Sequence, residues 1–364
     1  MEVRHADEDP GRGAAGRETY GLKVLERTLA AAGCDDEQAN LRELRQWLFE
    51  GLIGLAREFD GMGIDASSPL EQRAARFILD LPGKRLRPLC ALVASRIGEG
   101  WRSPVVRDVA VAAEMVHNAT LLHDDVIDLG TERRGLPCAR VVYGNAASVL
   151  GGDFLLVRAV RRIHRHGRPE LVFGLLDVVE AMVDAEAEQL ELRGRMVFDR
   201  ERYLRIVQGK TASLFRWSLS GAAQAAGAPE AHVKALETVG ACMGVAFQLV
   251  DDLLDVEGDA EALGKDLFAD LEEGKMTWPF IIAAERAPSF VATLEGWMRD
   301  HRAGEAGRPD AVLALLVETE AAAATRAFAV QQSELALDAL RTLPPSPART
   351  ILEVIVQAIV HRRQ

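Results

Sequence analysis

Cysteine is scarce in this 364-residue chain, and no motif joins the few cysteines that occur. A disulfide framework or a structural zinc site needs cysteines at characteristic spacings, and disulfides also need an oxidising compartment. The sequence has no Cys-x-x-Cys pair and no Cys/His group among its four dispersed cysteines, Cys34, Cys90, Cys138 and Cys242. It therefore predicts reduced thiols in a cytoplasmic protein.

The sequence also has no excess of positive charge and no long apolar run. The net charge is −12, and no basic stripe is present that could neutralise the phosphates of a nucleic acid. Nucleic acid is therefore not expected as a partner, whereas a small anionic substrate stays possible because local arginines and metal ions decide its binding. Arg216, Glu230 and Glu237 interrupt the longest apolar candidates, so no transmembrane segment is expected.

Signals for β-structure are equally few. Alternating β-branched runs with hairpin turns are scarce, only 14 prolines occur, and good helix formers such as alanine, leucine, glutamate and arginine dominate. The fold class is therefore predicted to be all-α. Residues 1–20 mix acidic, basic and glycine residues without the apolar stretch of a secretory signal, so we expect a disordered N-terminal lead. Residues 21–364 show no linker and are expected to form a single domain.

A first aspartate cluster follows an apolar stretch with helical character. Asp124 and Asp125 lie four and three residues before Asp128, so a helix projects all three toward one side, where like charges repel. Such a cluster needs a counterion, and Mg²⁺ is commonly held by one or two carboxylates together with substrate phosphates. Arg133 and Arg134 follow, and guanidinium groups match phosphate oxygens. A single cluster of this kind is equally compatible with a solvated acidic turn.

A second cluster with the same spacing makes the solvated turn a poor explanation. Asp251, Asp252 and Asp255 follow another apolar run, and Gln248 precedes them by one helical turn on the same side. Unpaired carboxylates are costly in apolar surroundings. Two such clusters facing one another would hold several divalent cations.

Two further segments carry positive charge beside glycine. Gly83–Pro88 places Lys84, Arg85 and Arg87 in a compact cationic group at a predicted helix start, where main-chain amides also favour anions. Gln208–Thr211 interrupts a helical stretch, and a glycine inside a helix costs about 1 kcal/mol relative to alanine. We therefore expect a local kink there that orients Lys210.

The two Asp-Asp-x-x-Asp motifs and the Gly83–Pro88 segment, in this order, resemble the trans-prenyltransferases, the polyprenyl diphosphate synthase family. The resemblance runs from about residue 70 to the C-terminus and departs from the family at Pro82, where a second glycine is common. It implies a single large helical bundle of the isoprenoid synthase type with a central cavity, acting as a homodimer. It also implies condensation of isopentenyl diphosphate with an allylic prenyl diphosphate by Mg²⁺-assisted ionisation.

The resemblance also implies a role for each matching residue. Three Mg²⁺ ions would be held by Asp124, Asp128 and Asp251, with three more aspartates as ligands or as partners of ligands, namely Asp125, Asp252 and Asp255. The groups that would contact isopentenyl diphosphate are Lys84, Arg87, His117 and Arg134. The groups that would serve the allylic substrate and its diphosphate are Arg133, Lys210, the carbonyl of Thr211, Gln248, Lys265 and, as the weaker of the two later lysines, Lys275.

Product length is expected to follow from one position. In the family, a bulky aromatic side chain five residues before the first aspartate closes the cavity, and here this residue is Ala119. No Phe, Tyr or Trp lies between Val105 and Asp124, so we expect a product of at least four isoprene units. A farnesyl synthase remains an alternative, because other helices can close the cavity.

Three other classes fit less well. A class I terpene cyclase normally lacks the second aspartate motif and the Lys84–Arg87 group. A regulatory subunit would usually have lost one motif. A di-iron protein would need Glu-x-x-His pairs, which this sequence does not contain.

Overall fold

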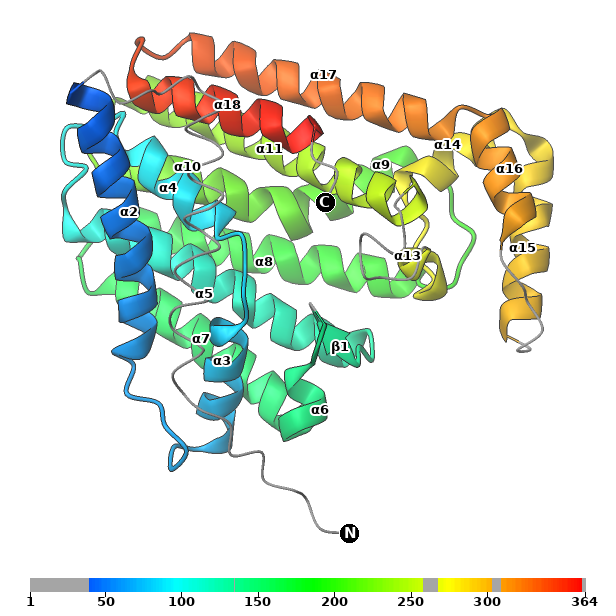
Figure 1. Ribbon diagram of the computed structural model, residues 1–364, viewed down its shortest axis with the longest axis horizontal. Helices are drawn as coiled ribbons and strands as arrows, with labels where there is room; N and C mark the ends of the chain where they lie inside the picture. The colour runs from blue at the N-terminus through cyan, green and yellow to red at the C-terminus, as the bar shows by residue number, and fades with distance from the viewer. Residues whose placement is uncertain (1–38, 134, 258–267, 303–308, 362–364) are drawn as a thin grey trace. The chain divides into compact units, whose positions relative to one another are not determined.

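The predicted all-α fold is confirmed. The computed structural model describes residues 39–133, 135–257, 268–302 and 309–361, and these form helices joined by short connections (Figure 1). In this described part of the chain the sheet content is one two-stranded hairpin, in which β1 (Glu132–Arg133) pairs antiparallel with β2 (Leu136–Pro137). The predicted lead, residues 1–20, lies outside the described residues.

The chain groups into two compact units, and each is described separately. Unit 1 contains the described residues of Met1–Val172, Gly221–Pro229 and Ser346–Ile351. Unit 2 contains those of Phe173–Ser220, Glu230–Pro345 and Leu352–Gln364. The expectation of a single domain over residues 21–364 stays a prediction.

Unit 1 is organised around helix α5 (Pro104–Ile127). Proline at its first position suits the fixed φ of a helix start, and a run of valine and alanine gives it a wide apolar surface. Val109, Met115 and Leu122 are almost fully buried, which places this helix in the core of the unit. The helices that accompany it in unit 1 are α2 (Ala39–Asp60), α3 (Leu70–Asp80), α4 (Leu86–Ser95), α6 (Ala139–Tyr143) and α7 (Asn145–His164).

Unit 1 also contains a buried ionic cluster at Asp108 on α5. This carboxylate accepts hydrogen bonds from Arg162 Nη1 at 2.6 Å, Arg165 Nη2 at 2.6 Å and His166 Nε2 at 2.5 Å. Burial by itself raises the pKa of Asp108, but hydrogen bonds from His166, Arg165 and Arg162 outweigh burial, and the pKa lies below its usual value. The cluster ties α5 to the C-terminal end of α7.

Unit 2 is organised around helix α11 (Glu230–Glu257), along which α17 (Ala321–Arg341) runs (Figure 1). Leu249, Val250 and Leu253 of α11 are buried, so the apolar run before the second aspartate cluster forms part of the core. Three helices belong partly to each unit, namely α8 (Pro169–Leu192), α10 (Ser213–Ala225) and α18 (Pro347–His361). The remaining elements of unit 2 are α9 (Arg200–Val207), the π-helical turn η1 (Gln208–Ala212), α13 (Ala269–Glu272), α14 (Trp278–Arg286), α15 (Pro288–Arg302) and α16 (Asp310–Glu318).

Helix α11 is, among the described residues, the one helix long and apolar enough to cross a membrane. Half of its most apolar window is buried inside the protein, and the same helix carries Asp251, Asp252 and Asp255. Length and composition do not separate such a helix from an ordinary core helix, so the expectation that no segment spans a membrane stays a prediction.

Candidate active site

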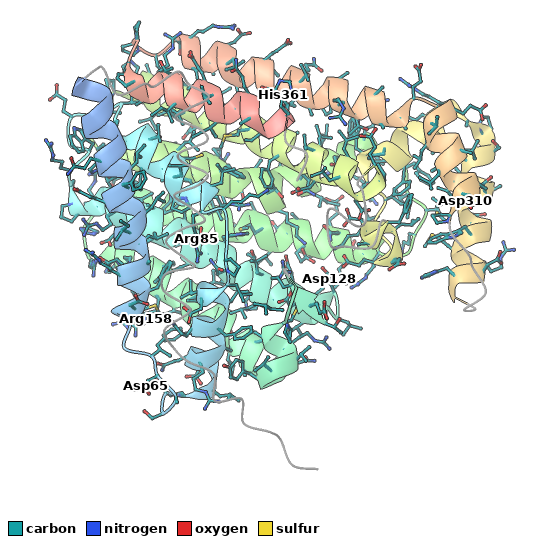
Figure 2. The ribbon with its side chains drawn as sticks, in the orientation of Figure 1. Asp65, Arg85, Asp128, Arg158, Asp310 and His361 are labelled. Carbon is teal, nitrogen blue, oxygen red and sulfur yellow. The ribbon has the colours of Figure 1, made fainter. Side chains whose placement is uncertain are left out.

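The first aspartate cluster lies at the C-terminal end of α5, where Asp128 is the C-cap (Figure 2). Asp124 and Asp128 are partly exposed, whereas Asp125 is only 2% exposed. Oδ1 of Asp125 accepts two hydrogen bonds from Arg133, from Nε at 3.0 Å and from Nη2 at 2.7 Å. The second aspartate of the motif therefore holds Arg133 in place. Burial and the neighbouring Asp125 carboxylate also raise the pKa of the Cys138 thiol to about 11, which keeps this thiol protonated.

One arginine of the cationic turn before α4 is tied to a neighbouring helix by an ion pair. Arg85 caps α4 in the left-handed conformation, with φ of 49°, and forms an ion pair with Glu114 of α5. Glu114 is further fixed by Asn118, whose Nδ2 donates to the Glu114 side chain at 3.0 Å. Arg85 therefore positions the turn, and all three cations of the turn, Lys84, Arg85 and Arg87, are partly exposed. The sequence had grouped all three cations together.

His117 and Ala119 occupy different environments on α5. His117 lies three residues beyond Glu114, so it projects from the same side of the helix as the Arg85 ion pair, and it is partly exposed. Ala119 is fully buried. A methyl group is thus all that this position contributes to the interior of unit 1.

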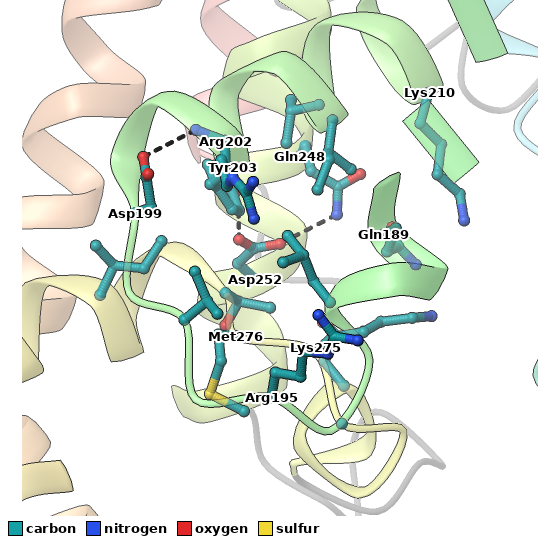
Figure 3. Close-up of a pocket in the computed structure, with 18 of the residues that line it drawn as sticks. Gln189, Arg195, Asp199, Arg202, Tyr203, Lys210, Gln248, Asp252, Lys275 and Met276 are labelled. Atoms are coloured by element: carbon teal, nitrogen blue, oxygen red, sulfur yellow. Dashed lines mark hydrogen bonds between the residues drawn. The ribbon is translucent and has the colours of Figure 1, made fainter. Parts of the chain in front are cut away.

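The second aspartate cluster in unit 2 is also built around a buried central carboxylate. Asp252 is 1% exposed and accepts hydrogen bonds from the Tyr203 hydroxyl at 2.5 Å and Gln248 Nε2 at 3.0 Å (Figure 3). It also accepts one from the main-chain amide of Trp278 at 3.3 Å. Burial and the charge of Asp270 raise the pKa of Asp252 to about 7. Burial also raises the Tyr203 pKa well above its usual value, so this phenol remains a hydrogen-bond donor.

Asp255 completes this group of carboxylates. Its Oδ1 accepts a hydrogen bond from the main-chain amide of Ala269 at 3.0 Å, while its buried Oδ2 has no hydrogen-bond partner among the described residues. Burial and the charge of Asp270 raise its pKa to about 7. Oxygen donors of this kind, one of them unsatisfied, fit a hard divalent cation. Asp251, the remaining member of the cluster, is partly exposed.

The described residues do not contain a group of three or more His, Cys, Asp or Glu side chains arranged as a complete metal site. The central aspartate of each motif already accepts hydrogen bonds from the protein, although Oδ2 of Asp125, like Oδ2 of Asp255, is buried and accepts none from the described residues. Each cluster also offers two outer carboxylates, Asp124 and Asp128 or Asp251 and Asp255. That number suits Mg²⁺, which usually takes one or two carboxylates and completes its shell with water and substrate phosphate.

The interruption expected at Gln208–Thr211 is confirmed as the π-helical turn η1. Gly209 is required there because a Cβ at this position would lie 2.5 Å from the carbonyl oxygen of Ala181 on α8. The turn directs Lys210 to an ion pair with Glu186 of α8. The Thr211 hydroxyl donates to Gln248 Oε1 at 3.0 Å, so a hydrogen-bond chain leads from η1 through Gln248 to the second cluster.

A pocket in unit 2 collects several of these groups (Figure 3). Lys275 reaches it from the segment between α13 and α14, and its ammonium is paired with Glu273. Arg195 enters from the segment between α8 and α9. The polar side chains around the pocket are mixed in charge, so a ligand would meet donors and acceptors at once; they include Gln189, Arg195, Lys210, Gln248, Asp252 and Lys275.

Comparison with known proteins assigns the chain to a family. The sequence profile described as "Polyprenyl synthetase" matches residues 68–315. The chain belongs to the polyprenyl synthetase family. An octaprenyl diphosphate synthase from Haemophilus influenzae is 34% identical over 301 residues, covering 82% of this chain and 90% of that protein. A short chain isoprenyl diphosphate synthase from Methanothermobacter thermautotrophicus is 32% identical over 295 residues, covering 80% of this chain and 90% of that protein.

Solved structures of this family agree with the fold. A polyprenyl synthase from Caulobacter crescentus, complexed with calcium and isoprenyl diphosphate, superposes with a TM-score of 0.78 at 30% identity, over 94% of this chain and 98% of that one. The predicted isoprenoid synthase fold is therefore confirmed, and membership of the polyprenyl synthetase family makes the chain a prenyltransferase.

The structure describes most but not all of the residues that the family resemblance assigned. Arg134 and Lys265 lie outside the described residues. Within unit 1 the structure places Lys84, Arg87, His117, Ala119 and Arg133 on or beside α4 and α5 with the first cluster. Within unit 2 it brings Lys210, Thr211, Gln248 and Lys275 to the pocket at which Asp252 lies.

The sequence did not reveal every residue that supports the site. Tyr203 was missed because it is 49 residues from Asp252, and nothing in its helical context signals a buried hydroxyl donor. Glu186 pairs with Lys210 only because η1 packs closely against α8, and spacing along the chain does not predict that contact. Arg195 carried no signal.

Proposed function

We propose that the chain is a trans-polyprenyl diphosphate synthase that condenses isopentenyl diphosphate with an allylic prenyl diphosphate. One observation carries the proposal: both aspartate motifs have a buried central carboxylate that orients protein groups and two outer carboxylates suited to metal. Such duplication suits a substrate whose diphosphate is held by several cations. The octaprenyl and short chain diphosphate synthases that resemble the chain support the same reaction.

The metal that fits these carboxylates is Mg²⁺, and by analogy with the family three ions would be held by Asp124, Asp128 and Asp251. The calcium in the Caulobacter relative supports dependence on a divalent cation. When bound, Mg²⁺ supplies positive charge to the departing diphosphate. Asp255, whose buried Oδ2 has no partner among the described residues, is a further candidate ligand. Oδ2 of Asp125 is also without such a partner, but its Oδ1 is bonded twice to Arg133, so we propose that Asp125 and Asp252 act by orienting Arg133 and Gln248.

The protein's own cations would act on the allylic substrate. We propose that Arg133 and Lys210 donate hydrogen bonds to its diphosphate, and that Lys265 and Lys275 assist. Negative charge grows on the diphosphate as its bond to the allylic carbon breaks, so donors already fixed by protein contacts stabilise the transition state more than the ground state. Arg133 meets this condition because Asp125 holds it by two hydrogen bonds. The carbonyl of Thr211 would face the reacting carbon.

Isopentenyl diphosphate would be held by a separate group. We propose Lys84, Arg87, His117 and Arg134 for its diphosphate, with Arg85 fixing the turn through Glu114. The double bond of this substrate then adds to the allylic carbon. A proton must leave the adduct, and none of the described side chains at these positions is an evident general base, so the released diphosphate is the proposed acceptor.

The product is proposed to contain at least four isoprene units. The support is Ala119, which is fully buried and too small to obstruct a growing chain. Sequence similarity does not select the length, because an octaprenyl synthase and a short chain synthase resemble the chain at 34% and 32% identity. A farnesyl product is therefore the main alternative.

We propose that the active protein is a homodimer. The part of α8 in unit 2 carries four exposed large apolar side chains at intervals of three or seven residues, a spacing that gathers them on one stripe, namely Phe173, Leu176, Val183 and Leu190. Contiguous apolar surface of this kind marks interaction sites, and a second copy would offer the same stripe. Light scattering on the purified chain should give twice the chain mass, and Val183→Glu should give the mass of one chain.

We also propose a cytoplasmic location and no nucleic-acid partner. The dispersed cysteines and the net charge of −12 support these proposals. Cell fractionation tests the location, and recovery of the protein only with membranes after a high-salt wash would refute it.

The reaction is tested by a product assay with Mg²⁺, labelled isopentenyl diphosphate and farnesyl diphosphate, read by chain length. Elongation to four or more units is the expected result, and it should stop when a chelator is added and resume with Mg²⁺. Consumption of the allylic diphosphate without isopentenyl diphosphate would instead indicate a terpene cyclase. Absence of any turnover by folded protein would indicate a regulatory subunit.

A further inference from the structure

Both described lysines of the unit 2 pocket are paired with glutamates that do not line it. Lys210 of η1 forms an ion pair with Glu186 of α8, and Lys275 forms one with Glu273. Lys210 and Lys275 contribute to the pocket wall, and neither glutamate does. Each of these lysines thus belongs to the pocket wall and to an ion pair with a glutamate outside it.

These pairs are sheltered from water. The side chains of Lys210 and Glu186 are 25% and 17% exposed, and those of Lys275 and Glu273 are 18% and 34% exposed. Exposed ion pairs are weak because solvent and salt screen them, whereas partly buried pairs are screened less. A carboxylate in this position competes effectively with any other anion for the same ammonium.

The main chain fixes both pairs. Gly209 allows η1 to approach α8 so closely that a Cβ would lie 2.5 Å from the Ala181 carbonyl oxygen, and this approach sets Lys210 beside Glu186. Gly274 separates Glu273 from Lys275 and has φ of 80°, in the left-handed region, where a Cβ would lie 2.6 Å from an amide nitrogen of Gly194. Pairs built on backbone geometry of this kind are not chance contacts between flexible surface chains.

We propose that Glu186 and Glu273 are exchangeable counter-ions, positioning residues that hold Lys210 and Lys275 when no diphosphate is bound and release them when one arrives. This inference rests on the proposed function, because it assigns the ligand of the pocket as a diphosphate group. A diphosphate carries more negative charge than a single carboxylate and displaces it from the ammonium. The displaced glutamate then pulls the lysine back, which weakens retention of the diphosphate released by the reaction.

The proposal predicts the direction in which the affinity for inorganic diphosphate changes when a glutamate is replaced. Glu186→Gln keeps the size and an acceptor oxygen but removes the competing charge, so inorganic diphosphate should bind more tightly. For one partly sheltered pair we expect a roughly 3- to 10-fold lower Kd. Glu273→Gln should act in the same direction, and the double variant should combine the two factors, because the lysines are separate sites on the pocket wall.

The control is Glu285→Gln. Glu285 of α14 pairs with Arg200 of α9 at 2.5 Å, and neither side chain lines the pocket. The diphosphate Kd of this variant should match that of the wild type. Glu186→Asp, which keeps the charge, should restore the wild-type Kd.

The experiment is isothermal titration of inorganic diphosphate into the purified full chain in the presence of EDTA, so that only protein groups are measured. Tighter binding by both glutamine variants supports the proposal. Unchanged or weaker binding overturns it, and so does absence of binding by the wild type and all variants. Because the titration needs no turnover, it separates this inference from the proposed function, whose failure would appear as absence of elongation in the product assay.

Steady-state kinetics give a second readout. With Mg²⁺ and both substrates, Glu186→Gln should lower KM for the allylic diphosphate and lower kcat, because the diphosphate product leaves more slowly. A merely structural role for Glu186 would lower kcat with an unchanged or higher KM, and that pattern would contradict the proposal.

Discussion

Replacing Asp125 by asparagine separates two roles for the central aspartate of the first motif. The family resemblance offered Asp125 as a metal ligand or as a partner of a ligand, and the structure shows it buried, with Oδ1 bonded twice to Arg133, at 3.0 and 2.7 Å. Asparagine keeps an oxygen at nearly the same place but removes the charge. Hydrogen bonds to charged groups contribute about 1.5–3 kcal/mol each, and the retained amide preserves part of this, so we expect a loss of about 1.5–3 kcal/mol in transition-state stabilisation.

That free energy corresponds to a decrease in kcat/KM of roughly 10- to 150-fold. The decisive assay is kcat/KM at increasing Mg²⁺ in the wild type and in Asp125→Asn. If Asp125 holds Arg133, the deficit persists at saturating Mg²⁺. If Asp125 is a direct ligand, the apparent Mg²⁺ affinity falls and high Mg²⁺ restores activity, a result that would refute our interpretation.

A double-mutant cycle with Arg133→Gln supplies the coupling between the two residues. Residues that act through one contact give non-additive effects, with interaction energies of about 0.5–3 kcal/mol. The double variant should therefore be little worse than Arg133→Gln alone. Fully additive losses in kcat/KM would show that Asp125 contributes independently of Arg133.

Three other predictions address stability and product length. Tyr203→Phe removes the donor that faces Asp252 at 2.5 Å, and thermal unfolding should show a loss of about 1–3 kcal/mol, whereas an unchanged Tm would contradict the importance of this bond. The Asp108 pKa is lowered in the folded protein, so its stabilisation is present above its unfolded value of about 3.9 and is lost as the pH falls through the folded value. The Tm deficit of Asp108→Asn should therefore shrink below about pH 4, and a deficit independent of pH would refute the linkage. Ala119→Phe places an aromatic ring at a fully buried position and should shorten the product, at a cost of about 1–3 kcal/mol in stability; an unchanged product length would place the limit elsewhere.

Periodicity and spacing predicted the helices of this protein and the positions of its motifs well. The apolar stretch with helical character before the first aspartate cluster is observed as the helix Pro104–Ile127, because apolar spacing and a proline at the start specify a helix locally. The same reasoning placed the two aspartate clusters at the ends of apolar helical runs. Gly209 correctly indicated an interruption, since a helix interior rarely gains from glycine.

The sequence could not divide the charged residues by role. Asp124 and Asp125 are neighbours with the same chemistry, yet only Asp125 is buried, and that difference depends on how the hairpin with Arg133 packs beside α5. Arg85 likewise looks equivalent to Lys84 and Arg87 until Glu114 on a different helix is seen to bind it. Such pairings join residues far apart in the chain, and spacing along a helix carries no information about them.

The contact between η1 and α8 has a consequence for engineering. Replacing a helical glycine by alanine is a common route to a more heat-resistant enzyme. The substitution lowers the conformational entropy of the unfolded chain, which stabilises the folded protein by about 0.4–1 kcal/mol. At Gly209 the added methyl group would meet the Ala181 carbonyl oxygen at 2.5 Å and the Ala185 side chain at 2.7 Å. Thermostabilisation protocols that scan helices for glycine should therefore leave Gly209 unchanged. The substitution would force η1 and α8 apart and displace Lys210.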